Sequence, residues 1–86
     1  MASDTSGLSD KALSIFAFAA YHRLLSGERI SSVIRRDGQG HEADPAGVAE
    51  LEQRGLATAS ETEIRFGGAA EDFVDRVAAA IRGASA

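Results

Sequence analysis

The chain has 86 residues, a net charge of −4 at pH 7 and no cysteine. This length provides one domain with a single small core and excludes a deep cleft between large elements. The lack of cysteine excludes disulfides, thiolate zinc sites and cysteine nucleophiles, and the acidic balance argues against a general hold on nucleic acid or anionic membrane.

The two ends of the chain differ in composition from the rest. Residues 1–7 and 83–86 are small and polar, so we expect flexible tails on a single domain that extends over residues 8–82.

The first predicted element is a helix that begins after Ser9 and ends at Gly27. Ser9 is a suitable N-cap, Asp10 places negative charge in the first turn, and Gly27 can adopt the left-handed conformation that closes a helix. Acidic residues precede the apolar stretch where a secretory signal needs positive charge. The stretch is also too short to span a membrane, so we expect a cytoplasmic protein with no membrane partner.

This helix has two apolar faces. One face consists of Leu13, Phe16, Ala17, Ala20 and Leu24. The nearly opposite face consists of Ile15, Phe18, His22 and Leu25. A helix that is apolar on both sides is either central in its own domain or shared with another chain. Burial of both faces within one chain is the alternative to our hypothesis, which is a homodimer through the second face.

The segment GERISSVIRRDG fits two kinds of element. Ile30, Val33 and Ile34 follow helical spacing, which predicts a short second helix that ends near Gly38. Ile30, Ser32 and Ile34 also alternate, as in an edge strand. The helix is the prediction, and the strand is its alternative.

The next segment, DGQGHEAD, is predicted to be a loop because it is dense in Gly and in residues that bond their own backbone. Its potential metal ligands are Asp37, His41, Glu42 and Asp44. Their spacing fits neither a zinc nor a calcium site, and the glycines lack the strand and the Lys of a nucleotide-binding loop. We therefore predict no metal and no cofactor.

A third helix is predicted from Pro45 to Arg54. Asp44 is its N-cap, Pro45 occupies the first helical position, and Gly55 follows its end, with Leu56 placed to contact Leu51 in a Schellman motif. A hairpin is expected next. One arm contains Leu56 and Thr58, the other contains Ile64 and Phe66, and the turn lies at Ser60 to Thr62.

The last predicted element is an amphipathic helix after Gly67 and Gly68. Acidic residues lie in its first turn and arginines toward its end. Its predicted core face consists of Phe73, Val77, Ala80 and Ile81. The fold class is therefore mainly α within α+β: three helices, a two-stranded hairpin and a C-terminal helix.

This order of elements resembles the winged helix-turn-helix over about residues 8–82, with LEQRGLATASETEIRF similar to its third helix and wing. The loop between the second and third helices is longer than the tight turn of that motif. The resemblance implies DNA binding, with the third helix in the major groove and the wing on the backbone.

The candidate DNA or phosphate contacts under this resemblance are Arg29, Arg35, Arg36, Arg54 and Arg65. Asp44, Glu50 and Glu52 on the third helix would repel phosphates, as would the glutamates of the hairpin. No catalytic residue is predicted, because His22 and His41 belong to no nucleophile motif and so small a domain offers little pocket. We therefore predict a non-enzymatic regulatory or protein-interaction domain that forms a homodimer and binds a further protein, with DNA-binding transcription regulation as the alternative.

Overall fold

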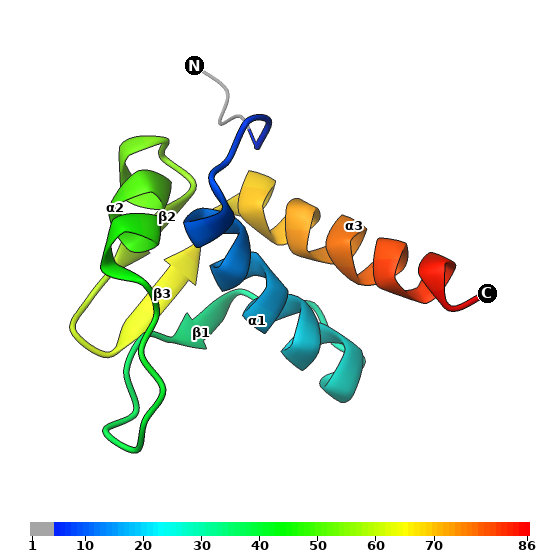
Figure 1. The fold of residues 1–86 in the computed structure, drawn as a ribbon, viewed down its shortest axis with the longest axis horizontal. Coiled ribbons are helices and arrows are strands. Elements are labelled where there is room, and N and C mark those ends of the chain that lie inside the picture. The colour runs from blue at the N-terminus through cyan, green and yellow to red at the C-terminus, as the bar shows by residue number, and fades with distance from the viewer. Residues whose placement is uncertain (1–4) are drawn as a thin grey trace.

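The first helix, α1 (Asp10–Ser26), contacts both other helices and lies against one end of the sheet (Figure 1). The computed structural model describes residues 5–86. The side chain of Ser9 accepts a hydrogen bond from the N–H of Ala12, and Gly27 closes the helix with a φ of 75° and a hydrogen bond from its N–H to the Arg23 carbonyl. Both predicted ends of this helix are confirmed.

The predicted second helix is wrong, because its place is taken by a strand, β1 (Ser32–Ile34). This strand pairs antiparallel with β3 (Glu63–Phe66), and Val33 lies opposite Ile64. Val33 is buried while Ile34 is exposed, as alternation requires. The spacing of the β-branched residues fits both a helix and a strand, and pairing with a strand distant in the sequence favours the strand.

The next helix, α2 (Pro45–Gln53), has the predicted caps. The Asp44 carboxylate accepts hydrogen bonds from the N–H groups of Ala46 and Gly47. At the other end, Gly55 has a φ of 71° and the N–H of Leu56 donates to the Leu51 carbonyl over 2.9 Å. This bond is the one that defines the expected Schellman motif.

The hairpin is also confirmed, and it forms part of a larger sheet. Strand β2 (Ala57–Ala59) pairs with β3, which lies in the middle of the order β1-β3-β2. The Ser60 side chain accepts hydrogen bonds from the N–H groups of Thr62 and Glu63 and so organises the turn. The sheet therefore has three strands, with β1 at one edge and β2 at the other.

The last helix, α3 (Gly68–Ala84), buries a face next to the predicted one, and the predicted Phe73 and Val77 are half-buried at its border. Its buried residues are Ala70, Val74 and Ala78. The predicted Ala80 and Ile81 are exposed, because the last turns extend away from the rest of the fold (Figure 1). The helix continues to Ala84, into the segment predicted to be a tail.

The core is built around the ring of Phe16, which contacts Phe66 at 5.6 Å and Phe73 at 4.7 Å between centroids. The fully buried large side chains are Phe16, Leu51, Leu56, Ile64, Val48 and Val74. The buried face of α1 consists of Ala12, Ile15, Phe16, Ala19 and Ala20. This face lies between the two predicted apolar faces and takes residues from both, so Ile15 of the predicted partner face belongs to the core.

Three helices and a small antiparallel sheet place the fold in the α+β class, as predicted, in an arrangement compatible with a winged-helix-like layout. None of the helices in residues 5–86 is long and apolar enough to cross a membrane.

Candidate protein-interaction surface

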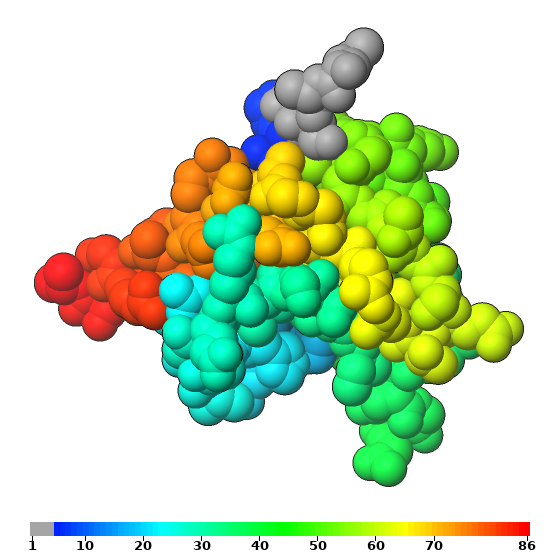
Figure 2. Space-filling model, turned by 180° about the vertical axis from the view of Figure 1, so that it is seen from behind, coloured from blue at the N-terminus to red at the C-terminus, as the bar shows by residue number. Residues whose placement is uncertain are grey.

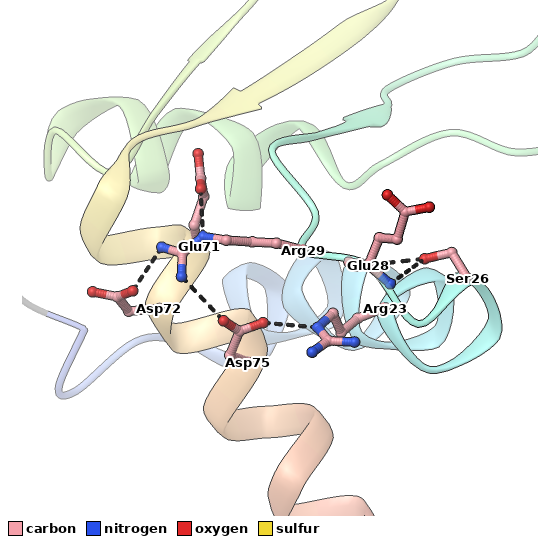
Figure 3. A network of polar contacts seen from close by, with 7 residues as sticks. All are labelled: Arg23, Ser26, Glu28, Arg29, Glu71, Asp72 and Asp75. Atoms are coloured by element: carbon pink, nitrogen blue, oxygen red, sulfur yellow. Dashed lines mark hydrogen bonds and ion pairs between the residues drawn. The ribbon is translucent and has the colours of Figure 1, made fainter.

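Arg29, the first of the predicted phosphate contacts, is held by carboxylates of α3 (Figure 3). Its guanidinium lies 2.7 Å from Glu71, 2.6 Å from Asp72 and 3.2 Å from Asp75. The hydrogen bond with Glu71, followed by that with Asp72, raises the pKa of Arg29 above its ordinary value. Three carboxylates around one guanidinium leave no excess positive charge for a phosphate.

The other four candidate arginines also have partners within the chain. Arg35 donates to the Ser60 carbonyl, Arg36 lies 3.3 Å from Glu42, and Arg65 lies 3.0 Å from Glu63. Arg54 donates to the carbonyls of Ser6 and Gly7, which holds residues of the predicted N-terminal tail against α2; residues 1–4 of that tail lie outside the described part. The five arginines are thus distributed over separate contacts within the chain.

The four predicted interface residues of α1 have different surroundings. Ile15 is 3% exposed and belongs to the core of the single chain, so it is unavailable to a partner. Phe18 and His22 are half-buried, and the Phe18 ring stacks on His41 at 4.2 Å. Leu25 is 71% exposed. The chain therefore brings Phe18, His22 and Leu25 toward one side, without the predicted Ile15.

The loop after β1 folds back on itself around Asp37. The carboxylate of Asp37 accepts hydrogen bonds from the N–H groups of Gln39 and His41, and the bond from Gln39 is the main cause that lowers the pKa of Asp37. His41 lies with its Nε2 atom 3.2 Å from the carbonyl oxygen of Ile34. Because a carbonyl only accepts, Nε2 carries the proton of this bond. No group of three possible metal ligands occurs among residues 5–86.

The outer edge of β1 carries backbone groups that the sheet does not use. The residues that flank β1 bond toward β3: the N–H of Phe66 donates to the Ser31 carbonyl, and the N–H of Arg35 donates to the carbonyl of Thr62, which precedes β3. In an antiparallel ladder every second residue bonds to a given neighbour, so the backbone groups of Ser32 and Ile34 point away from β3. Among these outward groups, the Ile34 carbonyl is bonded to His41, and the others have no partner in the described chain.

The opposite edge of the sheet is better covered. Ala59 of β2 is the equivalent outward residue there, and its N–H donates to the Glu52 carboxylate of α2 over 3.3 Å. Helix α2 also packs against β2. The β2 edge is therefore covered by α2, although the outward N–H and carbonyl of Ala57 have no hydrogen bond in the described part of the chain, as with Ser32 at the β1 edge.

Two apolar grooves lie beside the open edge. The first, of about 310 Å³, lies between the C-terminal half of α1 and β1, and its lining includes His22, Leu25, Ile30, Val33 and Ile34. The second groove, of about 210 Å³, lies beside the loop that contains His41. Its lining includes Phe18, Val33, Ile34, His41 and Ala43. Ile34, which lines both grooves, is 53% exposed. Figure 2 shows the segment that leads from α1 toward β1, in teal, at the surface of the molecule.

An edge strand at this place is the alternative that the sequence offers to the predicted helix. The alternation of Ile30, Ser32 and Ile34 is the pattern of an edge strand. Which backbone groups remain free depends on the pairing with β3, which the local sequence does not contain.

Compared with known proteins, the chain matches no protein-family model, no curated protein and no solved structure. The geometry of the surface is therefore the basis for a functional proposal.

Proposed function

We propose that this chain is a non-enzymatic protein-interaction domain that binds an extended segment of a partner along the outer edge of β1. The observation that carries the proposal is that the outward N–H and carbonyl of Ser32 and the outward N–H of Ile34 have no hydrogen bond in the described chain and lie beside two apolar grooves. Strand addition uses this combination, because main-chain hydrogen bonds give affinity and neighbouring pockets select side chains.

The composition of the edge supports this function. Exposed edges are usually protected by charged side chains, proline or a bulge, since an open edge invites pairing with other chains. The outward positions of β1 hold Ser32 and Ile34, which are neither charged nor proline. With Leu25 at 71% exposure nearby, the edge has the character of a binding surface.

The DNA-binding alternative has the winged-helix-like order of elements in its favour and the charges against it. Each candidate arginine has a partner in the chain, and Glu50 and Glu52 on α2 would face the phosphates of a bound duplex. Titration into random duplex DNA from about 50 to about 200 mM salt tests this alternative, because phosphate contacts make binding steeply salt-dependent. Steep binding weakened by Arg35→Ala and Arg36→Ala would replace our proposal.

The docking proposal is tested with peptides selected against the full chain from a random display library. Bound peptides should protect the amides of Ser32 and Ile34 from hydrogen exchange, and Ser32→Pro should abolish binding. Proline removes the outward N–H but no bond to β3, as is tolerated on edge strands. The matched control is Ser32→Ala, which removes the hydroxyl and keeps the N–H.

Two results would overturn the proposal. The first is that the selected peptides protect other amides from hydrogen exchange and leave the exchange of the Ser32 and Ile34 amides unchanged. The other is equal binding to Ser32→Pro and Ser32→Ala, both shown by circular dichroism to be folded.

A further inference from the structure

The sequence about Ser32 has a symmetric pattern. Taken every second residue it reads Glu28, Ile30, Ser32, Ile34 and Arg36, of which Ser32 and Ile34 lie in β1 and the others in the segments that flank it. The N–H of Glu28 donates to the Ser26 hydroxyl. About Ser32 this series places isoleucine opposite isoleucine and an acid opposite a base. An antiparallel pair of identical strands related by a two-fold axis has this kind of self-complementarity.

We propose that the segment docked on β1 is the β1 of a second copy of this chain, paired antiparallel with Ser32 opposite Ser32 of the other copy. This inference rests on the proposed docking function and names its occupant. This dimer differs from the one that the sequence predicts through α1. The edge of β1 forms the centre of its interface, and α1 contributes only the residues that line one side of the first groove.

The backbone groups fit this register. Ser32 of each copy donates its N–H to the Ser32 carbonyl of the other, so both of its outward groups are used. Ile34 then faces Ile30, whose N–H and carbonyl have no hydrogen bond in the described chain. The Ile34 carbonyl keeps a second lone pair beside its bond to His41. The two three-stranded sheets become one sheet of six strands.

The exposed apolar side chains support a second copy as the occupant. Leu25 and Ile34, at 71% and 53% exposure, line the same groove as Ile30. Pairing in this register brings Ile34 of one copy beside Ile30 of the other. Each of these contacts occurs twice because the interface is isologous.

The charges of Glu28 and Arg36 favour a second copy of the chain as the partner. The Glu28 side chain has no ion pair within residues 5–86, and its carboxylate points away from Arg23 and Arg29 (Figure 3). Arg36 is exposed, lies on the other side of Ser32 and is 3.3 Å from Glu42 of its own chain, so pairing with a second copy adds a second carboxylate to it or replaces Glu42. Antiparallel pairing places Glu28 of each copy opposite Arg36 of the other, and opposite charges across strands stabilise a pair. Parallel pairing would not bring these two charges together.

Sedimentation equilibrium of the full chain tests the inference, at concentrations from about 1 to about 500 µM, a range that detects weak to moderate association. We expect the wild type to dimerise and Ser32→Pro to weaken dimerisation at least about tenfold, because two hydrogen bonds are lost at once. Ile34→Lys should weaken it similarly. Ile81→Lys is the matched control, since Ile81 is 46% exposed on α3 outside the interface.

Charge reversal tests the register. Glu28→Arg or Arg36→Glu alone should weaken the dimer about five- to tenfold at low salt, and the double variant should return to within about twofold of wild type. Glu42→Gln is the control for Arg36, because it removes only the partner within the same chain.

The outcomes separate this inference from the proposed function. A wild-type monomer at the highest concentration overturns the second-copy inference, as does a dimer that Ser32→Pro and Ile34→Lys leave unchanged. If selected peptides still protect the Ser32 and Ile34 amides of that monomer, the docking function stands with another partner. If no peptide protects them, both proposals fail.

Discussion

Gly47 of α2 lies directly against the backbone of Lys11 in the first turn of α1. A Cβ atom added at Gly47 would lie 2.5 Å from the Lys11 carbonyl oxygen and 2.8 Å from its carbonyl carbon. Side chains at this position would push the two helices apart, because both contacting atoms belong to backbone. The absence of a side chain at Gly47 therefore permits the close crossing of α1 and α2.

The Gly47→Ala variant should lower the free energy of unfolding by about 1–3 kcal/mol, the usual cost of excess volume in a packed site. Urea denaturation measures this change. Gly83→Ala is the matched control, because Gly83 is also helical but has no atom within 4 Å of an added Cβ. That variant should be neutral or stabilising through helix propensity. Equal effects of the two substitutions would contradict the close-packing account.

The Phe16→Ala variant should destabilise the domain by about 3–5 kcal/mol, the range for removing a buried aromatic ring. Phe16 is fully buried and contacts the rings of Phe66 and Phe73. Phe18→Ala is the comparison, because Phe18 is half-buried and should cost less. Thermal unfolding of both variants checks the order, and a larger loss for Phe18→Ala would contradict the placement of the core.

The helix ends could be predicted from sequence because they depend on local residues. Ser9 and Asp44 bond to N–H groups within three residues, and Gly27 and Gly55 need only their own left-handed conformation. The hairpin between Leu56 and Phe66 has the same local character. These parts of the prediction are therefore confirmed.

The parts that failed depend on distant residues. Ser32 to Ile34 form a strand because Val33 meets Ile64, and the buried side of α1 is set by the directions from which α2 and the sheet approach. The candidate surface also depends on contacts between residues that are distant in the sequence. Arg29 is a candidate phosphate contact in the sequence, whereas its partners in the structure are carboxylates of α3.

Stability should fall at acid pH through Glu50, which joins α2 to the start of α1. Its carboxylate accepts hydrogen bonds from the hydroxyl and the N–H of Ser9, and the bond from the hydroxyl is the larger cause that lowers its pKa below 4.5. A carboxylate with a lower pKa in the folded state stabilises above the unfolded pKa, and this contribution is lost as pH falls through the folded pKa.

The Glu50→Gln variant should therefore lose less stability than wild type between neutral pH and pH values below 4.5. Urea denaturation at a series of pH values measures the slope. Ser9→Ala should reduce the same slope, and the double variant should add little to either single change. An unchanged slope in Glu50→Gln would show that another carboxylate controls the acid response.

Arg29 connects the segment after α1 to α3, so its removal should destabilise the domain in a salt-dependent way. Arg29→Gln leaves Glu71 and Asp72 without their cation, and the resulting repulsion is screened as salt rises, since the Debye length is only about 3 Å at 1 M. The melting temperature should drop most at low salt and approach that of wild type near 1 M. Arg82→Gln is the control with the same charge change, because Arg82 makes no ion pair within residues 5–86. A loss in Arg29→Gln that is independent of salt would assign the role of Arg29 to packing of its aliphatic stem.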